Sequence, residues 1–498
     1  VGFLDAVTLR EEARFRTTAG VDGRATVEPR ANYFTARVKR DLRLGNTTIG
    51  AALNTVHRDL GDEELAPMFR SAAYVGGVDW QHAWHDRRWA FDGAVVLSSN
   101  HGSAEAIDQL QLSPARYYQR PDREGYFRDS SRTSLTGYVA EMTLAKLSGK
   151  WRATLTYQDY SPGFEVNESG FIGSTDMRGL ASLVGYIDNA PKRQVRNWGQ
   201  YLFWNPSWNY DGDVTFNGVG AITYAELPNF WNVQLRLDWR PPVIDDRLTR
   251  GGPNAGLTTG YAVRADIDSD RRKRLTYGLT TSRSWNAAGG WGITLNPRAS
   301  LRPSSAVRVS LQPSYSRTHA MAQYVTRVAD PLASDTHGAR YVFATLDQHQ
   351  LALVTRLDWT FTPELSLQLF AQPLLAGNDF TDYKEFARPR EFAFEVYGRD
   401  AGTIARSEAG LYTVDPDGAG AAAPFSFNER DFNQRSLRGN AVVRWEYRPG
   451  SALFLVWQQR RFEQVRSGEF GPGHDLGELW GTKPENVFVV KGTWWVGR

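Results

Sequence analysis

The stretch 349–372 alternates apolar and polar residues on both sides of a very short turn. Residues 349–361 place three Leu, one Trp and one Phe on one face and mostly polar residues on the other. Residues 362–364 leave room only for a tight reversal, and residues 365–372 alternate again. Successive side chains of a strand point to opposite faces, so this stretch predicts an antiparallel hairpin with one apolar and one polar side.

The same unit recurs along the whole chain, with short turns at one end of the hairpins and mostly long connections at the other. We count roughly twenty such strands in the 498 residues. This asymmetry is typical of membrane barrels, which have short periplasmic turns and long extracellular loops. We therefore predict an all-β fold, a large antiparallel transmembrane β-barrel of about 20 strands. We expect residues 1–498 to form one domain, the C-terminal portion of a longer protein whose first strands can lie outside this chain.

The composition fits strands better than helices as the membrane-spanning elements. Aromatic residues make up 13% of the chain, the mean hydropathy is −0.47, and no run of eighteen apolar residues occurs. Helical spans are therefore excluded, whereas barrel strands expose only alternate residues to lipid and use aromatic residues at both interfaces. The chain contains no cysteine, which excludes disulfides, thiolate zinc sites and cysteine nucleophiles. A net charge of +3 gives no reason to expect nucleic acid as a partner.

Four stretches resemble a bacterial family of outer-membrane proteins, the domain of unknown function 5916 family. They are SPGFEVNESGFI at 161–172, DDRLTRGGP at 245–253, FTPELSLQLFAQP at 361–373 and YKEFARPR at 383–390. The resemblance covers nearly the whole chain. It implies a β-barrel in the bacterial outer membrane and a link to glycans, because members carry an N-terminal domain similar to family-nine carbohydrate-binding modules. That domain is absent from this chain, and the family provides no catalytic residues to carry over.

Charged and amide side chains occupy the polar phase of several predicted strands, where they would line a lumen. One interpretation is a salt-bridged, water-filled wall, and the other is a ladder that selects a solute. The candidates are Arg37, Lys39, Gln234, Arg236, Asp238, Arg356, Asp358, Gln368, Arg444 and Glu446.

The long connections supply candidates for a plug, above all loops 102–132 and 377–435. The alternating apolar residues of the SPGFEVNESGF loop suggest a segment folded back into the barrel mouth, although its two Glu could also bind a ligand. In DDRLTRGGP, the arginines favour a salt-bridged loop anchor over a catalytic acid pair. The loop and plug candidates are Phe164, Glu165, Asn167, Glu168, Arg247, Arg250, Lys384, Glu385, Arg388 and Arg390.

Other combinations give weaker signals. Tyr117, Tyr118, Tyr126 and Phe127, with arginines nearby, could stack on sugars or pack within their loop. His82 and His85 are three apart in a predicted strand and point to opposite faces, which disfavours a metal pair. The sequence around 415–418 only faintly resembles a calcium loop. We expect no metal, no cofactor and no catalytic residues.

Three functions remain open from the sequence. The first is an outer-membrane channel or transporter for a polar solute, a glycan product being one candidate. The second is a non-conducting barrel whose long loops bind a partner at the surface, and the third is a membrane-associated hydrolase. The expected location is the bacterial outer membrane, and the expected partners are its lipid bilayer and a glycan or another small polar solute.

Overall fold

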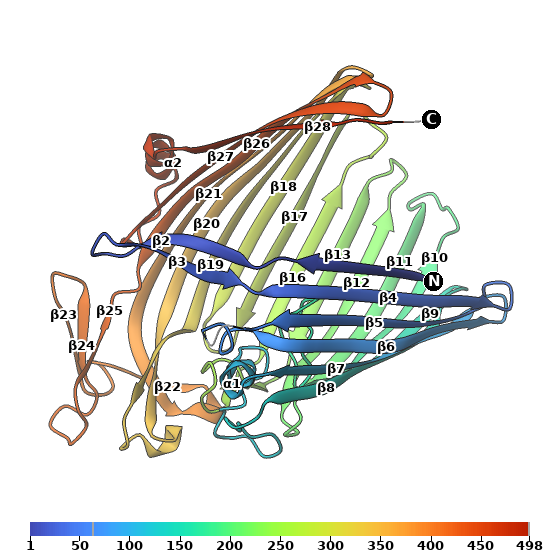
Figure 1. Ribbon diagram of the computed structural model, residues 1–498. Coiled ribbons are helices and arrows are strands. Elements are labelled where there is room, and N and C mark those ends of the chain that lie inside the picture. The colour runs from blue at the N-terminus through green and yellow to red at the C-terminus, as the bar shows by residue number, and fades with distance from the viewer. Residues whose placement is uncertain (62–63, 497–498) are drawn as a thin grey trace.

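A single antiparallel sheet dominates the computed structural model (Figure 1), which describes residues 1–61 and 64–496. The sheet has 21 strands, 20 of which follow one another as neighbours. In spatial order these 20 are β1 (Gly2–Thr8), β4 (Arg30–Leu42), β5 (Thr47–Asp59), β6 (Arg70–Trp84), β7 (Trp89–Gly102), β8 (Ser134–Lys146), β9 (Trp151–Tyr160), β10 (Met177–Asp188), β11 (Asn197–Trp208), β12 (Val214–Glu226), β13 (Asn232–Arg240), β16 (Gly260–Asp268), β17 (Leu275–Asn286), β18 (Trp291–Ser304), β19 (Val307–Ala329), β20 (Ala339–Thr362), β21 (Leu365–Arg388), β26 (Phe432–Arg448), β27 (Ser451–Val465) and β28 (Glu485–Thr493).

The two ends of the sheet differ as the sequence predicted. At the turn end, the connections within this run are two to eight residues long, as at 363–364 and 189–196. At the opposite end, called here the loop end, most connections are long and carry further elements. The all-β class, the antiparallel order and the count of about twenty strands are confirmed.

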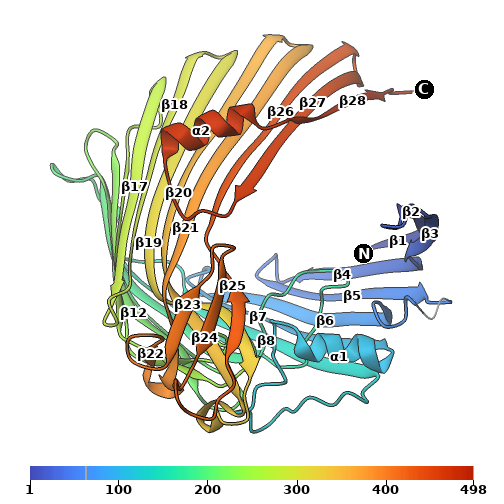
Figure 2. The same cartoon turned by 90° about the vertical axis from the view of Figure 1, so that its left-hand side faces the viewer.

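The sheet curls into a wall that is open along one side. Figure 2 looks along this wall and shows β1 at one free edge and β28 at the other. Within the described residues no ladder joins these two strands, and both expose large apolar side chains, Phe3 at 79% and Phe488 at 75%. Strand direction alternates along the run, so β1 and β28 are antiparallel. An antiparallel seam would therefore close either directly or through an even number of added strands.

The connection between β1 and β4 is itself a hairpin. β2 (Glu11–Arg16) and β3 (Asp22–Glu28) pair with each other and prolong the β1–β4 hairpin beyond the sheet. Most side chains of this extension are exposed on both faces. An extension without a buried face carries no apolar alternation, which is the signal on which the strand prediction depended.

The loop predicted at 377–435 is largely strand, and so is the connection at 318–340. β19, β20 and β21 are each 23 or 24 residues long in total. They continue past register shifts at Ala320/Gln323 and Phe343/Thr345. A bulge reverses which face a residue occupies, so the alternation breaks although the strand continues. Beyond them lie β22 (Ala393–Val396), which pairs with the end of β21, and a small sheet of β23 (Thr403–Arg406), β24 (Leu411–Asp415) and β25 (Phe425–Asn428).

Helices are confined to the connections. α1 (Ala104–Leu112) lies between β7 and β8, and α2 (Pro472–Gly481) lies between β27 and β28. None of the helices in the described ranges combines the length and apolarity needed to cross a bilayer. The remaining short elements are β14 (Val243–Asp245), β15 (Ala255–Leu257), η1 (Ser334–Thr336) and η2 (Pro389–Glu391).

Buried apolar clusters lie at the loop end rather than along the wall. One joins Val342 and Ala344 of β20 to Val414 and Phe427 of the small sheet. Another joins Phe343 to Ala255 of β15. Because these clusters attach the connections to the strand ends, the loop end is a packed unit.

Candidate functional site

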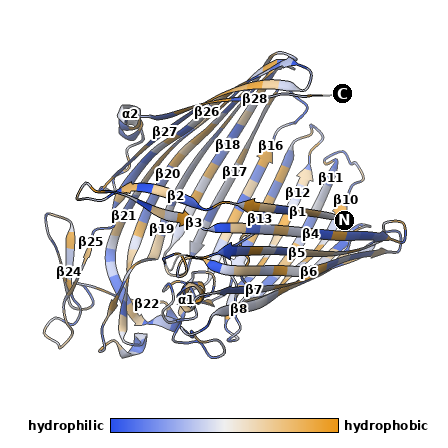
Figure 3. Cartoon of the chain, in the orientation of Figure 1, coloured by the Kyte–Doolittle hydropathy of each residue, from blue (hydrophilic) through white to orange (hydrophobic). Residues whose placement is uncertain are grey.

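The two faces of the wall differ in chemistry, as β13 illustrates. Leu235, Leu237 and Trp239 share one face and are 43%, 45% and 46% exposed, while Arg236 and Asp238 on the other face are half-buried. Figure 3 shows hydrophobic and hydrophilic positions interleaved along the strands in the same way. A folded chain that leaves such large apolar side chains uncovered on many strands presents an apolar surface far beyond that of a soluble monomer.

The predicted lumen residues lie on the strands, and many of them pair along or across the sheet. Arg37 of β4 pairs with Asp79 of β6, at 2.5 and 2.8 Å. Arg236 binds Asp238 two residues further on at 2.7 Å, and Arg444 binds Glu446 likewise at 2.5 Å. The other members lie directly opposite partners in the register: Lys39 opposite Gly50, Gln234 opposite Asp266, Arg356 opposite Phe370, and Asp358 opposite Gln368.

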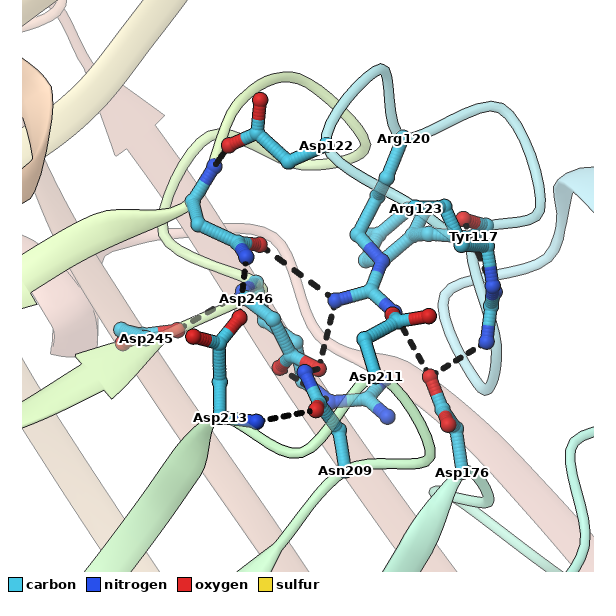
Figure 4. A network of polar contacts seen from close by, with 12 residues as sticks. Tyr117, Arg120, Asp122, Arg123, Asp176, Asn209, Asp211, Asp213, Asp245 and Asp246 are labelled. Atoms are coloured by element: carbon cyan, nitrogen blue, oxygen red, sulfur yellow. Dashed lines mark hydrogen bonds and ion pairs between the residues drawn. The ribbon is translucent and has the colours of Figure 1, made fainter. Parts of the chain in front are cut away.

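The loop end holds a network of charged side chains, buried at its centre, that joins several connections. Its centre is Arg120, which donates to Asp176 at 2.6 Å, Asp246 at 2.7 Å and Asp211 at 3.2 Å. Arg123 binds the same carboxylate of Asp176 (Figure 4). We call the following residues the loop clasp: Arg120, Asp122, Arg123, Asp176, Asp211, Asp213, Asp246, Asn254, His337 and Arg390.

The outer members of the loop clasp reach more distant strands. Asp122 accepts from the Asn254 backbone at 2.7 Å and lies 2.9 Å from His337 Nε2, in the connection between β19 and β20. Asp213 accepts from Arg390 of η2 at 2.7 Å. The loop clasp thus joins connections from β7–β8 to β21–β22, far apart in the sheet, at the loop end.

Burial makes the loop clasp energetically sensitive. Arg120, Asp176 and Asp246 are 4%, 3% and 6% exposed. A buried charge that loses its partner costs about 3–5 kcal/mol, because nothing replaces the water it gave up. Burial also raises the pKa of the neighbouring Asp245 carboxyl, although this carboxylate accepts hydrogen bonds from the Arg247 and Leu248 backbone.

The connection between β9 and β10 lies against the strand ends. Glu165 is buried, binds Arg116 at 2.7 Å and receives the Asn167 backbone N–H at 2.7 Å. Phe164 is buried above Gly137 of β8, where a Cβ atom would lie 2.1 Å from the Phe164 nitrogen. Glu168 binds Arg58 of β5 at 2.6 Å and also Arg70 of β6. Each of the three carries a structural contact.

The other loop candidates are dispersed rather than gathered into one site. Arg247 donates to the Pro114, Ala115 and Thr175 carbonyls, and Arg250 lies over the Tyr324 ring at 4.6 Å. Lys384 and Glu385 belong to strand β21, not to a loop, because β21 continues to Arg388. Lys384 donates to Thr345 at 2.7 Å, Glu385 binds Arg340 at 2.5 Å, and Arg388 binds Glu391 at 2.6 Å.

His82, Asp415 and Asp417, weighed above as metal ligands, contact other groups of the protein. In residues 1–61 and 64–496, no group of three or more His, Asp and Glu is arranged to hold an ion. His82 lies 2.8 Å from the Thr47 hydroxyl and stacks on Trp84. Asp415 and Asp417 accept hydrogen bonds from the backbone of their own turn.

The most important residues that the sequence did not single out are the acids of the loop clasp other than Asp246. Asp176 and Asp211 stand in separate connections, 56 and 91 residues from Arg120. The signal present in the sequence is the run of Arg116, Arg120 and Arg123 in one polar loop.

Comparison with solved structures finds weak likenesses to siderophore and ferric enterobactin receptors. The ferric enterobactin receptor of Pseudomonas aeruginosa is 9% identical, with a TM-score of 0.37 over 91% of this chain and 75% of that one. The siderophore receptor of Acinetobacter baumannii is 9% identical, with a TM-score of 0.40 over 93% of this chain and 71% of that one. These scores are too low to transfer anything to this chain. No curated protein sequence matches it.

The family comparison covers almost every residue. The model of the domain of unknown function 5916 family matches residues 1–497. This agrees with the four stretches singled out in the sequence. The chain therefore belongs to the domain of unknown function 5916 family.

Proposed function

We propose that the chain forms the wall of an outer-membrane β-barrel that passes a polar solute, a glycan product in the finer form of the proposal. The observation that carries it is the two-sided chemistry of a curled 20-strand antiparallel sheet. Residues such as Leu235, Leu237 and Trp239 would contact acyl chains, while Arg236 and Asp238 would line water. The short turns would face the periplasm and the loop end the exterior.

The relative exposure of the two faces supports a barrel with the polar phase inside and the apolar phase outside. On β5, the residues of the apolar phase, Ile49 and Leu53, are 50% and 42% exposed, whereas Thr48 and Gly50 of the polar phase are buried. Side chains crowd together on the concave side of a curved sheet and spread apart on its convex side. The polar phase of β5 is therefore best placed on the inside of the curl.

Closure of the seam is part of the proposal, because lipid offers no partner for backbone groups. Each unsatisfied N–H or C=O in the hydrocarbon costs several kcal/mol. β1 and β28 would therefore pair in the membrane, directly or through an even number of strands. Engineered cysteines at Leu4 and Val489 test direct pairing in this cysteine-free chain: an intrachain disulfide indicates a direct seam in which these two positions are neighbours.

The loop clasp would restrict the outer mouth. It joins connections from strands far apart in the sheet, and the charged groups at its centre, Arg120, Asp176 and Asp246, are buried. A wall of about twenty strands encloses a wide lumen, so it must be either an aqueous channel or a barrel plugged by its own loops. In this proposal the loop clasp keeps the connections over the mouth, and the solute passes when they part.

Planar-bilayer recordings test the transport proposal against the non-conducting alternative. The folded chain should give single-channel current, and the Arg120→Gln/Arg123→Gln variant should give a larger one because the loop clasp is loosened. Insertion is verified independently by flotation with lipid vesicles. Inserted protein that carries no current in either form would refute transport and favour a surface-binding barrel.

A further inference from the structure

A large cavity lies at the loop end, beside the loop clasp, and none of the charged side chains of the loop clasp line it. It measures about 1040 Å³ and is bounded on one side by the ends of β6, β7 and β8 and on the other by segment 125–132. Small-ligand sites are commonly about 300–1,000 Å³. The volume therefore suits a ligand of several rings rather than one of a single ring.

The strand side of the cavity is a shallow floor between aromatic rings. The register aligns Tyr74, Ser99 and Thr136 in one row across three strands, and Gly76, Leu97 and Tyr138 in the next. All six line the cavity. The small side chains in these rows leave room for a ligand, while Tyr74 and Tyr138 rise at the sides.

The rings around this floor are held in place. Tyr74 lies edge-on between the rings of His57 and His101, with centroids 5.2 and 6.0 Å away. The Tyr138 hydroxyl is 2.9 Å from that of Tyr210. Aromatic rings that are already immobilised lose little entropy when a ligand binds.

The opposite side of the cavity is anchored by the loop clasp. Asp211 receives the Gly125 backbone N–H at 3.4 Å, and the Arg123 guanidinium lies 5.9 Å from the Tyr126 ring centroid. Phe127 next to it is 62% exposed, and Tyr126 is 37% exposed, as is Tyr74. Several ring faces are thus open to the cavity at fixed positions.

The charged side chains at the rim of the cavity are paired with one another. Arg128 makes two hydrogen bonds to Asp108, at 2.7 and 2.6 Å, and Arg132 lies 3.5 Å from Asp129. Opposite charges in such pairs largely cancel, so they do not favour a strongly charged ligand. The remaining lining offers ring faces, hydroxyls and small side chains.

We propose that this cavity binds a neutral oligosaccharide. A sugar ring presents flat C–H faces that pack on aromatic rings, and hydroxyls that pair with groups such as Thr136 and the tyrosine hydroxyls. The inference goes beyond the proposed function: Gly76 of this floor lies directly opposite Leu53, on the phase placed outside the curl, so the sugar would be held on the outer face of the loop end rather than carried through the lumen.

Calorimetric titration of the folded full chain in detergent tests this assignment. The probes are the pentasaccharides of α-1,4-glucan, β-1,4-glucan and β-1,4-xylan, with pentagalacturonate as the charged comparison. At least one neutral probe should bind, and Phe127→Ala should weaken that binding about tenfold through the lost ring face. Phe171→Ala, which removes an 88% exposed ring outside the cavity lining, should leave it unchanged.

Three results would overturn the assignment: no binding of any neutral probe, tighter binding of pentagalacturonate, or binding unaffected by Phe127→Ala. Correct folding of the variants is verified by their resistance to protease in the same detergent. The titration requires neither conductance nor a bilayer. A channel that binds none of the sugars would refute only this inference, and a sugar-binding chain without current would refute only transport.

Discussion

Arg37 of β4 and Asp79 of β6 pair with each other across the intervening strand β5. They can do so because the position between them is Gly50, which lies directly opposite Asp79 in the register. A Cβ atom at Gly50 would lie 2.5 Å from Arg37 Nη2 and 2.7 Å from Asp79 Oδ2. The absence of one side chain thus allows a salt bridge to span three strands.

Substitution Gly50→Ala should break this pair with little effect on the sheet. The two side chains are 42% and 36% exposed, and exposed pairs contribute about 0.2–1 kcal/mol. A double-mutant cycle that includes Asp79→Asn measures the coupling free energy between Arg37 and Asp79. This coupling should vanish once Gly50 is Ala. Gly76→Ala is the control, because its Cβ would meet Leu53 at an ordinary 3.4 Å. Coupling that survives Gly50→Ala would contradict the account.

Substitution Arg120→Gln should open the loop end while the wall stays folded. It removes the charge shared by three buried carboxylates, at a local cost of about 3–5 kcal/mol. Amide hydrogen exchange in 103–133 and 209–213 should accelerate by orders of magnitude, whereas exchange in β13 stays slow. Arg128→Gln, which removes an exposed pair to Asp108, should change neither region. Equal effects of the two variants would refute a special role for Arg120.

Substitution Gly137→Ala should displace the connection between β9 and β10. The added Cβ would lie 2.1 Å from the Phe164 nitrogen and 2.4 Å from the Gly163 carbonyl carbon, both in the backbone. Overpacking of this kind typically costs 1–3 kcal/mol, and we expect about that here. Proteolytic cleavage within 161–176 should become faster. Gly439→Ala, whose Cβ would meet only the Phe370 carbonyl at 3.4 Å, should leave cleavage unchanged.

Asp270, in the turn between β16 and β17, should titrate unusually low. The Arg272 side chain, at 2.8 Å, lowers the pKa of this carboxyl to about 2, from 3.8. Because the folded pKa is the lower one, the stabilisation is present above about pH 4 and is lost as the pH falls toward 2. Carboxyl carbon NMR shifts measure this pKa directly. Arg272→Gln should raise it toward 3.8, and an unchanged value would show that Arg272 is not its cause.

The sequence predicted the wall because each strand carries its own alternation. Residues 349–372 need no distant partner to show a two-residue period, and β20 and β21 are strands there. The same reasoning failed where bulges shift the phase, as in 320–329, and where both faces are exposed, as in 11–28. In these places the strand is fixed by its neighbour in the sheet, which local periodicity does not reveal.

The loop clasp could not be predicted for a different reason. Arg120, Asp176 and Asp246 are brought together by connections whose conformations depend on the whole loop end. Each residue alone is an ordinary charged residue in a polar loop. Asp246 was singled out only through the DDRLTRGGP stretch, where the sequence predicts a salt-bridged anchor with the arginines of the same stretch. Arg120, from another connection, lies closer to Asp246 than Arg247 does, at 2.7 against 3.6 Å.

The most direct test of the central claim is the environment of consecutive residues on β13. The cysteine-free chain allows a nitroxide label at each position from 234 to 239 in turn, with the protein in lipid vesicles. Collision rates with oxygen, which concentrates in lipid, should peak at 235, 237 and 239. Rates with a water-soluble nickel chelate should peak at 234, 236 and 238. Rates without this two-residue alternation would contradict a wall with one face in lipid and the other in water.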